Sequence, residues 1–184
     1  MKLFAAVLLL CSIAHAQDCS PGWIRRGNTN FCYQFQNTPK SFDDAIGDCA
    51  SKSGLVTHIL DLEEQDFVSA MVKNQTSDIW LGLTDTDNGK GVWDWTGYIC
   101  VPTTYWDDVQ PSYGNGDANC AVMRANTSLW DDRDCSELHP YICKKKIVGT
   151  YPYFVPLNVT CSDNCMYKFP NRTCVPYDNR VKHV

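Results

Sequence analysis

Cysteine is the residue type that most constrains what this chain can fold into. The chain contains eleven cysteines, and one of them, Cys11, lies in an apolar amino-terminal stretch. That stretch has a basic residue, an apolar run and the small-x-small triplet 14–16, which is typical of a secretory signal peptide over residues 1–16. Eleven cysteines less Cys11 leave ten in the mature chain. An even number in an exported chain indicates disulfides rather than zinc thiolates, because the extracellular compartment oxidises thiols.

The predicted destination is the extracellular space. Outside the signal peptide, no segment approaches the run of about 18 apolar residues that a membrane helix needs, so we expect no membrane anchor. Four sequons agree with the secretory route and are predicted glycosylation sites, at Asn74, Asn126, Asn158 and Asn171.

The charge of the mature chain argues against two classes of partner. Loss of Lys2 with the signal peptide leaves 15 basic against 21 acidic residues, a net charge of −6. We therefore expect no binding to nucleic acid or to anionic membranes. The only basic run, residues 144–146, is interpreted as a solvated strand end.

Two segments have helical periodicity. Ser41 is a predicted N-cap, with Asp44 three residues on, and the apolar residues that follow recur at helical spacing: Phe42, Ala45, Ile46, Cys49 and Ala50. Asp61 is a second predicted N-cap, with Glu64 at the capping-box offset and apolar surface from Leu62, Phe67, Ala70 and Met71. We expect two helices, each with one buried face.

The remaining segments predict short strands around one long loop. Residues 23–35 are typical of a strand or hairpin, and four further segments are rich in aromatic and β-branched residues: 79–85, 91–97, 120–124 and 128–132. The irregular stretch between Tyr98 and Asn119 is long enough to indicate a functional loop. The order of strand, two helices and several strands predicts an α+β domain over residues 17–146.

The last 38 residues, 147–184, have a different composition. They contain four prolines and three cysteines and almost no helical period. So short a segment does not bury a core of its own, so we predict a Cys/Pro-rich tail stapled to the domain or to another chain.

No catalytic motif stands out, so the chain is interpreted as a non-enzyme. The mature chain has three histidines, His58, His139 and His183. None of them pairs with a serine or cysteine in a recognisable nucleophile motif. No zinc-protease, phosphate-loop or dinucleotide fingerprint is present.

Taken in order, several of these features resemble the C-type lectin domain over roughly residues 19–146. The features are "CSPGWIRRGNTNFCYQF", the helix cysteine Cys49, "WLGLTD", "WDW", "QP" at 110–111, "NC" at 119–120, "WDDRDC" at 130–135 and "YIC" at 141–143. The resemblance implies an α+β fold with two helices, small antiparallel sheets and a long ligand-binding loop. It also implies three disulfides, Cys19 with Cys32, Cys49 with Cys143, and Cys120 with Cys135.

Four mature cysteines are left over by those three pairs: Cys100, Cys161, Cys165 and Cys174. Three of them lie in the tail, and an odd number does not pair within itself. Either one tail cysteine reaches Cys100 beside the long loop, or the tail bridges two chains as a homodimer.

The resemblance further implies a Ca²⁺ site at the long loop, with the predicted ligands Gln110, Asp117, Asp131 and Asp132. Calcium prefers six to eight oxygen ligands, and these residue types supply them. The match is uneven, because Ser112 replaces the Asn or Asp of the family triplet and Ala118 stands where a glutamate is usual. The alternative is that residues 131–132 form a charged strand end near Arg133 and bind no ion.

The same loop is the predicted ligand surface, with Gln110, Ser112, Tyr113, Asp131 and Asp132 as its contact residues. The family resemblance implies a secreted lectin that binds glycans or glycoproteins through calcium, and the pair 110–111 favours galactose-type sugars. Tyr113 lies where galactose-type members place an aromatic ring, although an ordinary loop tyrosine is the alternative. The competing hypothesis for the whole domain is a protein-binding member of the same fold without the calcium and sugar site.

Overall fold

The computed structural model describes most of the predicted domain. It covers residues 19–86, 90–97, 101–114 and 118–147, together with the backbone of two short strands at 165–168 and 173–176. The predicted signal peptide 1–16 and most of the tail lie outside the described residues. So do several predicted site residues, namely Cys100, Asp117, Asn158, Cys161 and Asn171. In the part of the chain that is described, no helix has the length and apolar character needed to cross a bilayer.

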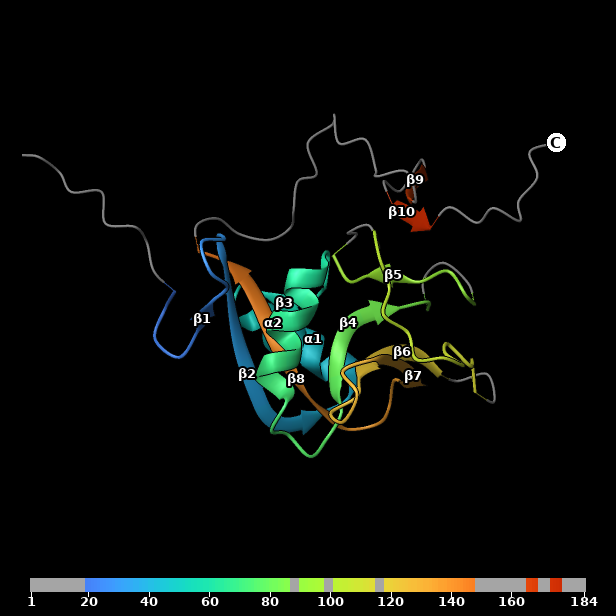
Figure 1. The fold of residues 1–184 in the computed structure, drawn as a ribbon, viewed down its shortest axis with the longest axis horizontal. Coiled ribbons are helices and arrows are strands. Elements are labelled where there is room, and N and C mark those ends of the chain that lie inside the picture. Colours follow the sequence, from blue (N-terminus) through green and yellow to red (C-terminus); the bar gives the residue numbers. More distant parts are fainter. Residues whose placement is uncertain are drawn as a thin grey trace, which may run out of the picture.

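Two helices and a set of short strands make up the fold, as predicted (Figure 1). The helices are α1 (Phe42–Ser51) and α2 (Leu62–Val72). The strands of the domain are β1 (Ile24–Arg25), β2 (Phe31–Lys40), β3 (Leu55–Val56), β4 (Ile79–Thr84), β5 (Asp94–Trp95), β6 (Ala118–Met123), β7 (Trp130–Asp134) and β8 (His139–Lys146). The tail contributes β9 (Cys165–Lys168) and β10 (Thr173–Pro176), which pair antiparallel, and β10 lies beside β5.

Both predicted N-caps are confirmed. The Ser41 hydroxyl accepts a hydrogen bond from the Asp44 amide at 3.3 Å, and the Asp61 carboxylate accepts one from the Glu64 amide at 2.7 Å. Each cap satisfies an amide that the first helical turn leaves without a partner, and this is why the helices begin where they do.

The strands of the domain form one sheet in the order β1-β2-β8-β4-β6-β7, with β3 added on β8 and β5 on β4. All of its strand pairs are antiparallel except β4 with β8, which are parallel at Trp80 and Tyr141. The expectation of wholly antiparallel sheets is therefore wrong at this pair. The reason is that β8 returns between β2 and β4, and its antiparallel pairing with β2 sets its direction relative to β4.

The core is aromatic. Trp80, Trp95 and Trp130 are fully buried, and Trp93 is nearly so. Trp106 is only partly buried, because it lies on the long loop and packs its ring on Trp130 with the centroids 5.8 Å apart. This contact fastens the loop to the core.

Among the described residues three disulfides close the domain: Cys19 with Cys32, Cys49 with Cys143, and Cys120 with Cys135. They are the pairs that the resemblance implies. The second bridge ties α1 to β8, and the third joins β6 to the end of β7, so the strands beside the long loop are covalently fixed.

Candidate functional site

The long loop is held against strand β7 by backbone hydrogen bonds. The Trp130 amide donates to the Tyr105 carbonyl at 2.8 Å, and the Asp107 amide donates to the Trp130 carbonyl at 2.9 Å. The loop therefore runs alongside β7 from residue 105 onward. This arrangement carries residues 110–114 toward Asp132.

Asp132 is the anchor of the loop. The residue is buried, with only 3% of its surface exposed to solvent. One carboxylate oxygen, Oδ1, accepts hydrogen bonds from the Ser112 amide at 2.8 Å and the Ser112 hydroxyl at 3.1 Å. The other, Oδ2, accepts from the Tyr113 amide at 2.5 Å. Hydrogen bonds to a carboxylate are roughly twice as strong as neutral ones, so this contact fixes the loop conformation.

Gln110 and Ser112 form the outer edge of this arrangement. The peptide bond between Gln110 and Pro111 is cis, and the Gln110 Oε1 atom accepts a hydrogen bond from the Ser112 amide at 2.7 Å. Ser112 is exposed, whereas Gln110 is half-buried. The fold therefore brings together Gln110, Ser112 and Asp132, three residues predicted to contact ligand.

The Tyr113 ring packs inward. Its backbone has a positive φ of 58°, and its side chain is partly buried against the core cluster that contains Trp93 and Trp130. Lys90 covers the ring at 5.6 Å from its centroid and donates a hydrogen bond to the Tyr113 carbonyl at 3.2 Å. A methyl group on Gly91 would lie 3.2 Å from the tyrosine oxygen, so the ring is packed between neighbours on this side.

Asp131 is buried and engaged with arginines. Its Oδ2 atom accepts hydrogen bonds from the Arg124 Nε and Nη2 atoms at 2.9 and 2.7 Å, and the Arg133 Nη1 atom lies 2.5 Å away. Hydrogen bonding to Asp131 raises the pKa of Arg124 above its ordinary value. Arg124 also pairs with Asp107 on the long loop. The charge of Asp131 is therefore neutralised inside the protein.

Asp85 is a further buried carboxylate that the sequence reasoning did not select. It follows β4 directly, is 2% exposed and accepts a hydrogen bond from the Gly91 amide at 2.7 Å. Burial raises the pKa of Asp85, and the nearby charge of Asp132 adds to that shift. The usable signal in the sequence is an acid placed immediately after a strand that is apolar except for its last residue, Thr84.

These contacts test whether the described residues fit a calcium ion. Calcium requires six to eight oxygen ligands. In the part of the chain that the structure describes, no three His, Cys, Asp or Glu side chains gather as a metal-binding group. The Oδ2 atom of Asp131 is engaged by two guanidinium groups, and both oxygens of Asp132 accept hydrogen bonds from the loop. The buried Asp131 Oδ1 atom has no hydrogen-bond partner among the described residues, and one such atom is far short of a calcium shell. The described arrangement therefore does not fit the implied ion, and Asp117 lies outside it.

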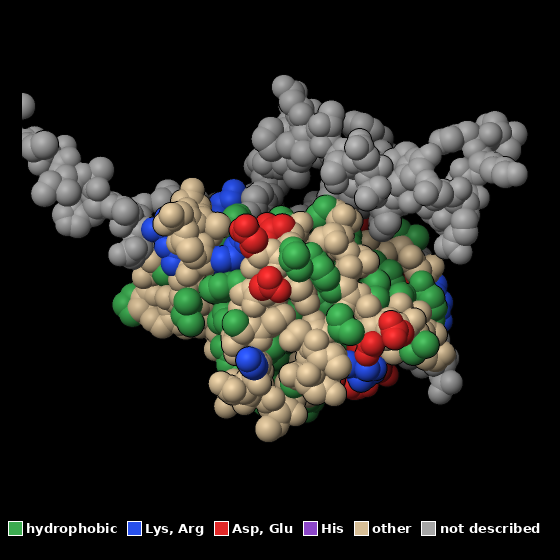
Figure 2. All heavy atoms as spheres, in the orientation of Figure 1, with side chains coloured by type: hydrophobic (Ala, Val, Ile, Leu, Met, Phe, Trp, Pro, Cys, Tyr) green, Lys and Arg blue, Asp and Glu red, His purple; other side chains and the backbone are tan. Residues whose placement is uncertain are grey.

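On the face of the molecule that Figure 2 shows, acidic and basic side chains of the described residues are interspersed rather than gathered in a basic stripe. The described part of this face is thus polar without a strong field of one sign. Such a surface suits neutral hydroxylated ligands or mixed protein surfaces better than polyanions.

Comparisons with known proteins identify the family. Residues 38–145 match the family model described as the Lectin C-type domain. The chain is 32% identical to C-type mannose receptor 2 of Mus musculus over 133 residues, which are 71% of this chain and 9% of that receptor.

Solved structures agree. One is the mouse scavenger receptor C-type lectin carbohydrate-recognition domain, which is 28% identical to this chain with a TM-score of 0.64. The match covers 72% of this chain and 100% of that domain. A calcium-independent type II antifreeze protein is 28% identical with a TM-score of 0.63, covering 72% of this chain and 98% of that one. The chain therefore belongs to the C-type lectin domain family.

Proposed function

We propose that this chain is a secreted glycan-recognition domain whose binding edge is formed by Gln110, Ser112 and Asp132. The observation that carries the proposal is the pinning of the exposed Ser112 onto the buried Asp132 carboxylate through two hydrogen bonds. This contact presents a hydroxyl and an amide side chain on a fixed backbone. Preorganised polar groups bind sugars without the entropic cost of ordering a loop.

The residue types suit sugar hydroxyls. A hydroxyl donates one hydrogen bond and accepts others, so its site needs both acceptors and donors. The Gln110 amide nitrogen supplies a donor, and the Ser112 hydroxyl, whose hydrogen is donated to Asp132, supplies an acceptor. The relatives that bear carbohydrate-recognition or mannose-receptor names favour the same ligand class.

Direct contact with these side chains, rather than contact through an ion, is the mode of binding that we propose. Both oxygens of Asp132 and the Oδ2 atom of Asp131 are already engaged by protein groups, and the structural similarity to a calcium-independent family member is compatible with this mode. The preference for galactose-type ligands that residues 110–111 imply stays a prediction. No step of a chemical reaction is assigned to the domain.

A second candidate function is protein binding through the same edge. The observation that favours it is the ion-pair network of Asp131, Arg124, Arg133 and Asp107, which engages Asp131 with arginines instead of leaving it open to a sugar. Glycoprotein ligands are compatible with either mode.

Dimerisation through the tail cysteines would raise the avidity of a weak site and is likewise a prediction.

A glycan array probed with the secreted full chain, with and without a chelator, tests the proposal. We expect binding that survives the chelator and is lost in Ser112→Val and Gln110→Leu. The matched control is Ser77→Ala, an exposed bend residue outside the edge, which should bind as the wild type does. A folded protein that gives no signal on any glycan would support protein binding instead. Loss of signal with the chelator would show that an ion takes part.

A further inference from the structure

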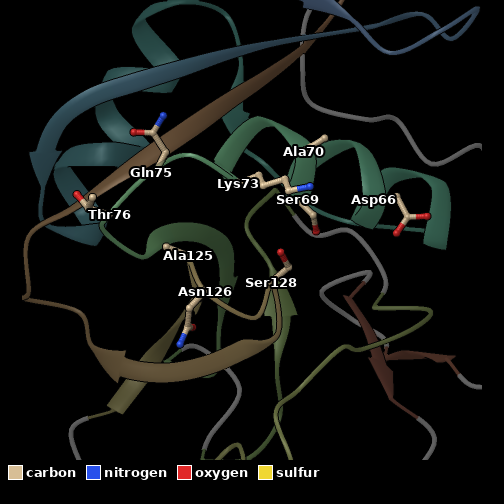
Figure 3. Close-up of a pocket in the computed structure, with 9 residues that line it drawn as sticks. All are labelled: Asp66, Ser69, Ala70, Lys73, Gln75, Thr76, Ala125, Asn126 and Ser128. Atoms are coloured by element: carbon tan, nitrogen blue, oxygen red, sulfur yellow. The ribbon is translucent and has the colours of Figure 1, made fainter.

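Two sequons that lie far apart in the sequence meet at one surface trough. The trough lies between α2 and the turn that joins β6 to β7, and it has a volume of about 790 Å³ (Figure 3). Helix α2 forms one wall, with Ser69 and Lys73. The other wall contains Asn126 and Ser128, the first and third residues of one sequon, while Thr76 of the sequon at Asn74 lies at an end of the trough.

Both asparagines are open to a modifying enzyme. Asn74 and Asn126 are exposed, and each lies in a turn, the first in the turn that follows α2 and the second in the turn between β6 and β7. In Figure 3 the Asn126 amide points away from α2 at the rim of the trough. Exposed turns are the sites at which a sequon in an exported chain is accessible for glycosylation.

The turn that bears Asn126 is fastened next to the helix. The Gln65 Nε2 atom of α2 donates to the Ser128 carbonyl at 2.6 Å. The Ala125 amide donates to the Asp78 Oδ1 atom at 3.0 Å, and the Ser128 amide donates to the Arg124 carbonyl at 2.9 Å. These bonds at both sides of Asn126 hold the sequon at a fixed place beside α2. A glycan attached there starts at the rim of the trough and covers it by turning back toward α2.

The trough itself suits sugar residues. Its volume lies within the range of about 300 to 1,000 Å³ typical of small-ligand sites. The Ser69 and Ser128 hydroxyls face the same space from opposite walls, and Lys73 extends along it (Figure 3). Ala70 and Ala125 add small apolar surface that can receive the apolar face of a sugar ring.

We propose that Asn74 and Asn126 both carry N-linked glycans and that the first sugars of these glycans cover this trough. In each modification the asparagine Nδ2 atom forms a bond to the anomeric carbon of the first sugar and gives up a proton. The bond that breaks joins this carbon to the diphosphate of a lipid-linked oligosaccharide donor, which leaves as the lipid diphosphate. The host's secretory pathway supplies the donor and the transferase.

The covered trough is separate from the recognition edge. Strand β6 runs from Ala118, which lies beside Gly114 of the loop, to Met123, just before the turn. The five steps between its six residues, at about 3.3 Å each, separate the two ends by roughly 17 Å. The glycans thus shield the α2 face while the edge at Ser112 stays open. The inference does not depend on what that edge binds.

The test uses the full chain secreted from a eukaryotic host. Enzymatic release of N-glycans in heavy-oxygen water, followed by peptide mass spectrometry, should show conversion of both Asn74 and Asn126 to labelled aspartate. Amine acylation of the intact protein should then report coverage. We expect Lys73 labelling to rise several-fold after deglycosylation, whereas Lys90, an exposed lysine at the loop, should stay constant.

Paired variants separate the glycan from the side-chain change. Thr76→Ala and Asn126→Gln remove the two sequons, and Thr76→Ser and Thr127→Ser keep them. The first pair should raise Lys73 labelling as deglycosylation does, and the second pair should not. Absence of a glycan at either asparagine, or unchanged Lys73 labelling although both sites are occupied, would overturn the proposal.

Discussion

Lys144 and Glu64 form an ion pair in which neither side chain reaches solvent, with exposures of 0% and 1%. Tyr33 donates its hydroxyl hydrogen to the same glutamate, and the Leu60 amide donates to the Glu64 Oε2 atom at 3.0 Å. Lys144 Nζ also donates to the His58 Nε2 atom at 3.0 Å. The pair joins α2 to β8 at the centre of the domain.

The energetic balance of this pair is set by desolvation. Burial lowers the pKa of Lys144 to about 8, although the Glu64 charge acts in the opposite direction. A buried charge that loses its partner is far more costly than the pair itself. The cluster therefore commits the fold to one arrangement of α2 on β8.

Glu64→Gln should destabilise the domain by about 3 to 5 kcal/mol, because it leaves the Lys144 ammonium buried without a counter-charge. Urea unfolding followed by tryptophan fluorescence measures this change. The double variant Glu64→Gln with Lys144→Met removes both charges and should recover part of the loss. Purely additive losses in the double variant would argue against coupling of the two residues.

His58 should make the domain sensitive to acid. Burial, together with the neighbouring Lys144 charge, holds the pKa of His58 well below its usual value of 6.5. As the pH falls below about 6.5, His58 takes up a proton in the unfolded chain but stays neutral in the folded protein. The free energy of unfolding therefore decreases as the pH falls. The slope should reach about 1.4 kcal/mol per pH unit. His58→Gln should flatten the unfolding free energy between neutral pH and pH ~5 relative to the wild type. Parallel curves for the two proteins would contradict this assignment.

Two glycines offer a matched test of backbone packing. A methyl group on Gly82 of β4 would lie 2.6 Å from the Val56 carbonyl oxygen and 2.8 Å from the Thr96 hydroxyl. Gly82→Ala should therefore cost about 1 to 3 kcal/mol through overpacking. Gly47 lies on the exposed face of α1, where a methyl group meets nothing within 4 Å. Gly47→Ala should stabilise by about 0.5 to 1 kcal/mol, and thermal unfolding of both variants checks the opposite signs.

Asp132→Ala should release the loop without unfolding the domain. It removes the acceptor of the Ser112 and Tyr113 amides, and a lost anchor of this kind costs about 1 to 3 kcal/mol. Hydrogen exchange at these two amides should accelerate, and ligand binding at the edge should be lost. Asp134→Ala, an exposed change on the same strand, is the control and should leave both properties intact. Unchanged exchange in Asp132→Ala would place the anchor of the loop elsewhere.

Calcium should leave thermal stability unchanged. A bound ion at a hundredfold excess over its Kd would add about 2.7 kcal/mol, which scanning calorimetry detects readily as a shift in Tm. We expect equal Tm values in calcium and in chelator. A calcium-dependent shift that disappears in Asp132→Ala would show that this carboxylate binds the ion. A shift that persists in the variant would place the ion away from Asp132.

Much of the architecture was readable in the sequence because it depends on local rules. Ser41 and Asp61 cap helices through contacts within three residues. The apolar spacing after the first cap correctly predicts the buried Phe42, Ala45 and Cys49 of α1. For α2 the predicted face is wrong, because the exposed side includes Leu62 and Ala70, and the buried residues are Glu64, Gln65, Val68 and Val72. The disulfide pairs followed from the family resemblance. The irregular segment around Pro111 was identified as functional, and it does meet Asp132.

The partners of the charged residues were decided only by the tertiary structure. The sequence predicts that residues 144–146 form a solvated strand end, and this prediction is wrong for Lys144, which is fully buried. Alternate side chains of β8 face opposite sides of the sheet, and Lys144 lies on the side where it forms an ion pair with Glu64. The same alternation along β7 places the neighbouring side chains of Asp131 and Asp132 on opposite sides. Asp131 therefore pairs with arginines, whereas Asp132 accepts hydrogen bonds from the long loop. Sequence shows which residues carry charge, but long-range packing decides which of those charges face each other, the core or solvent.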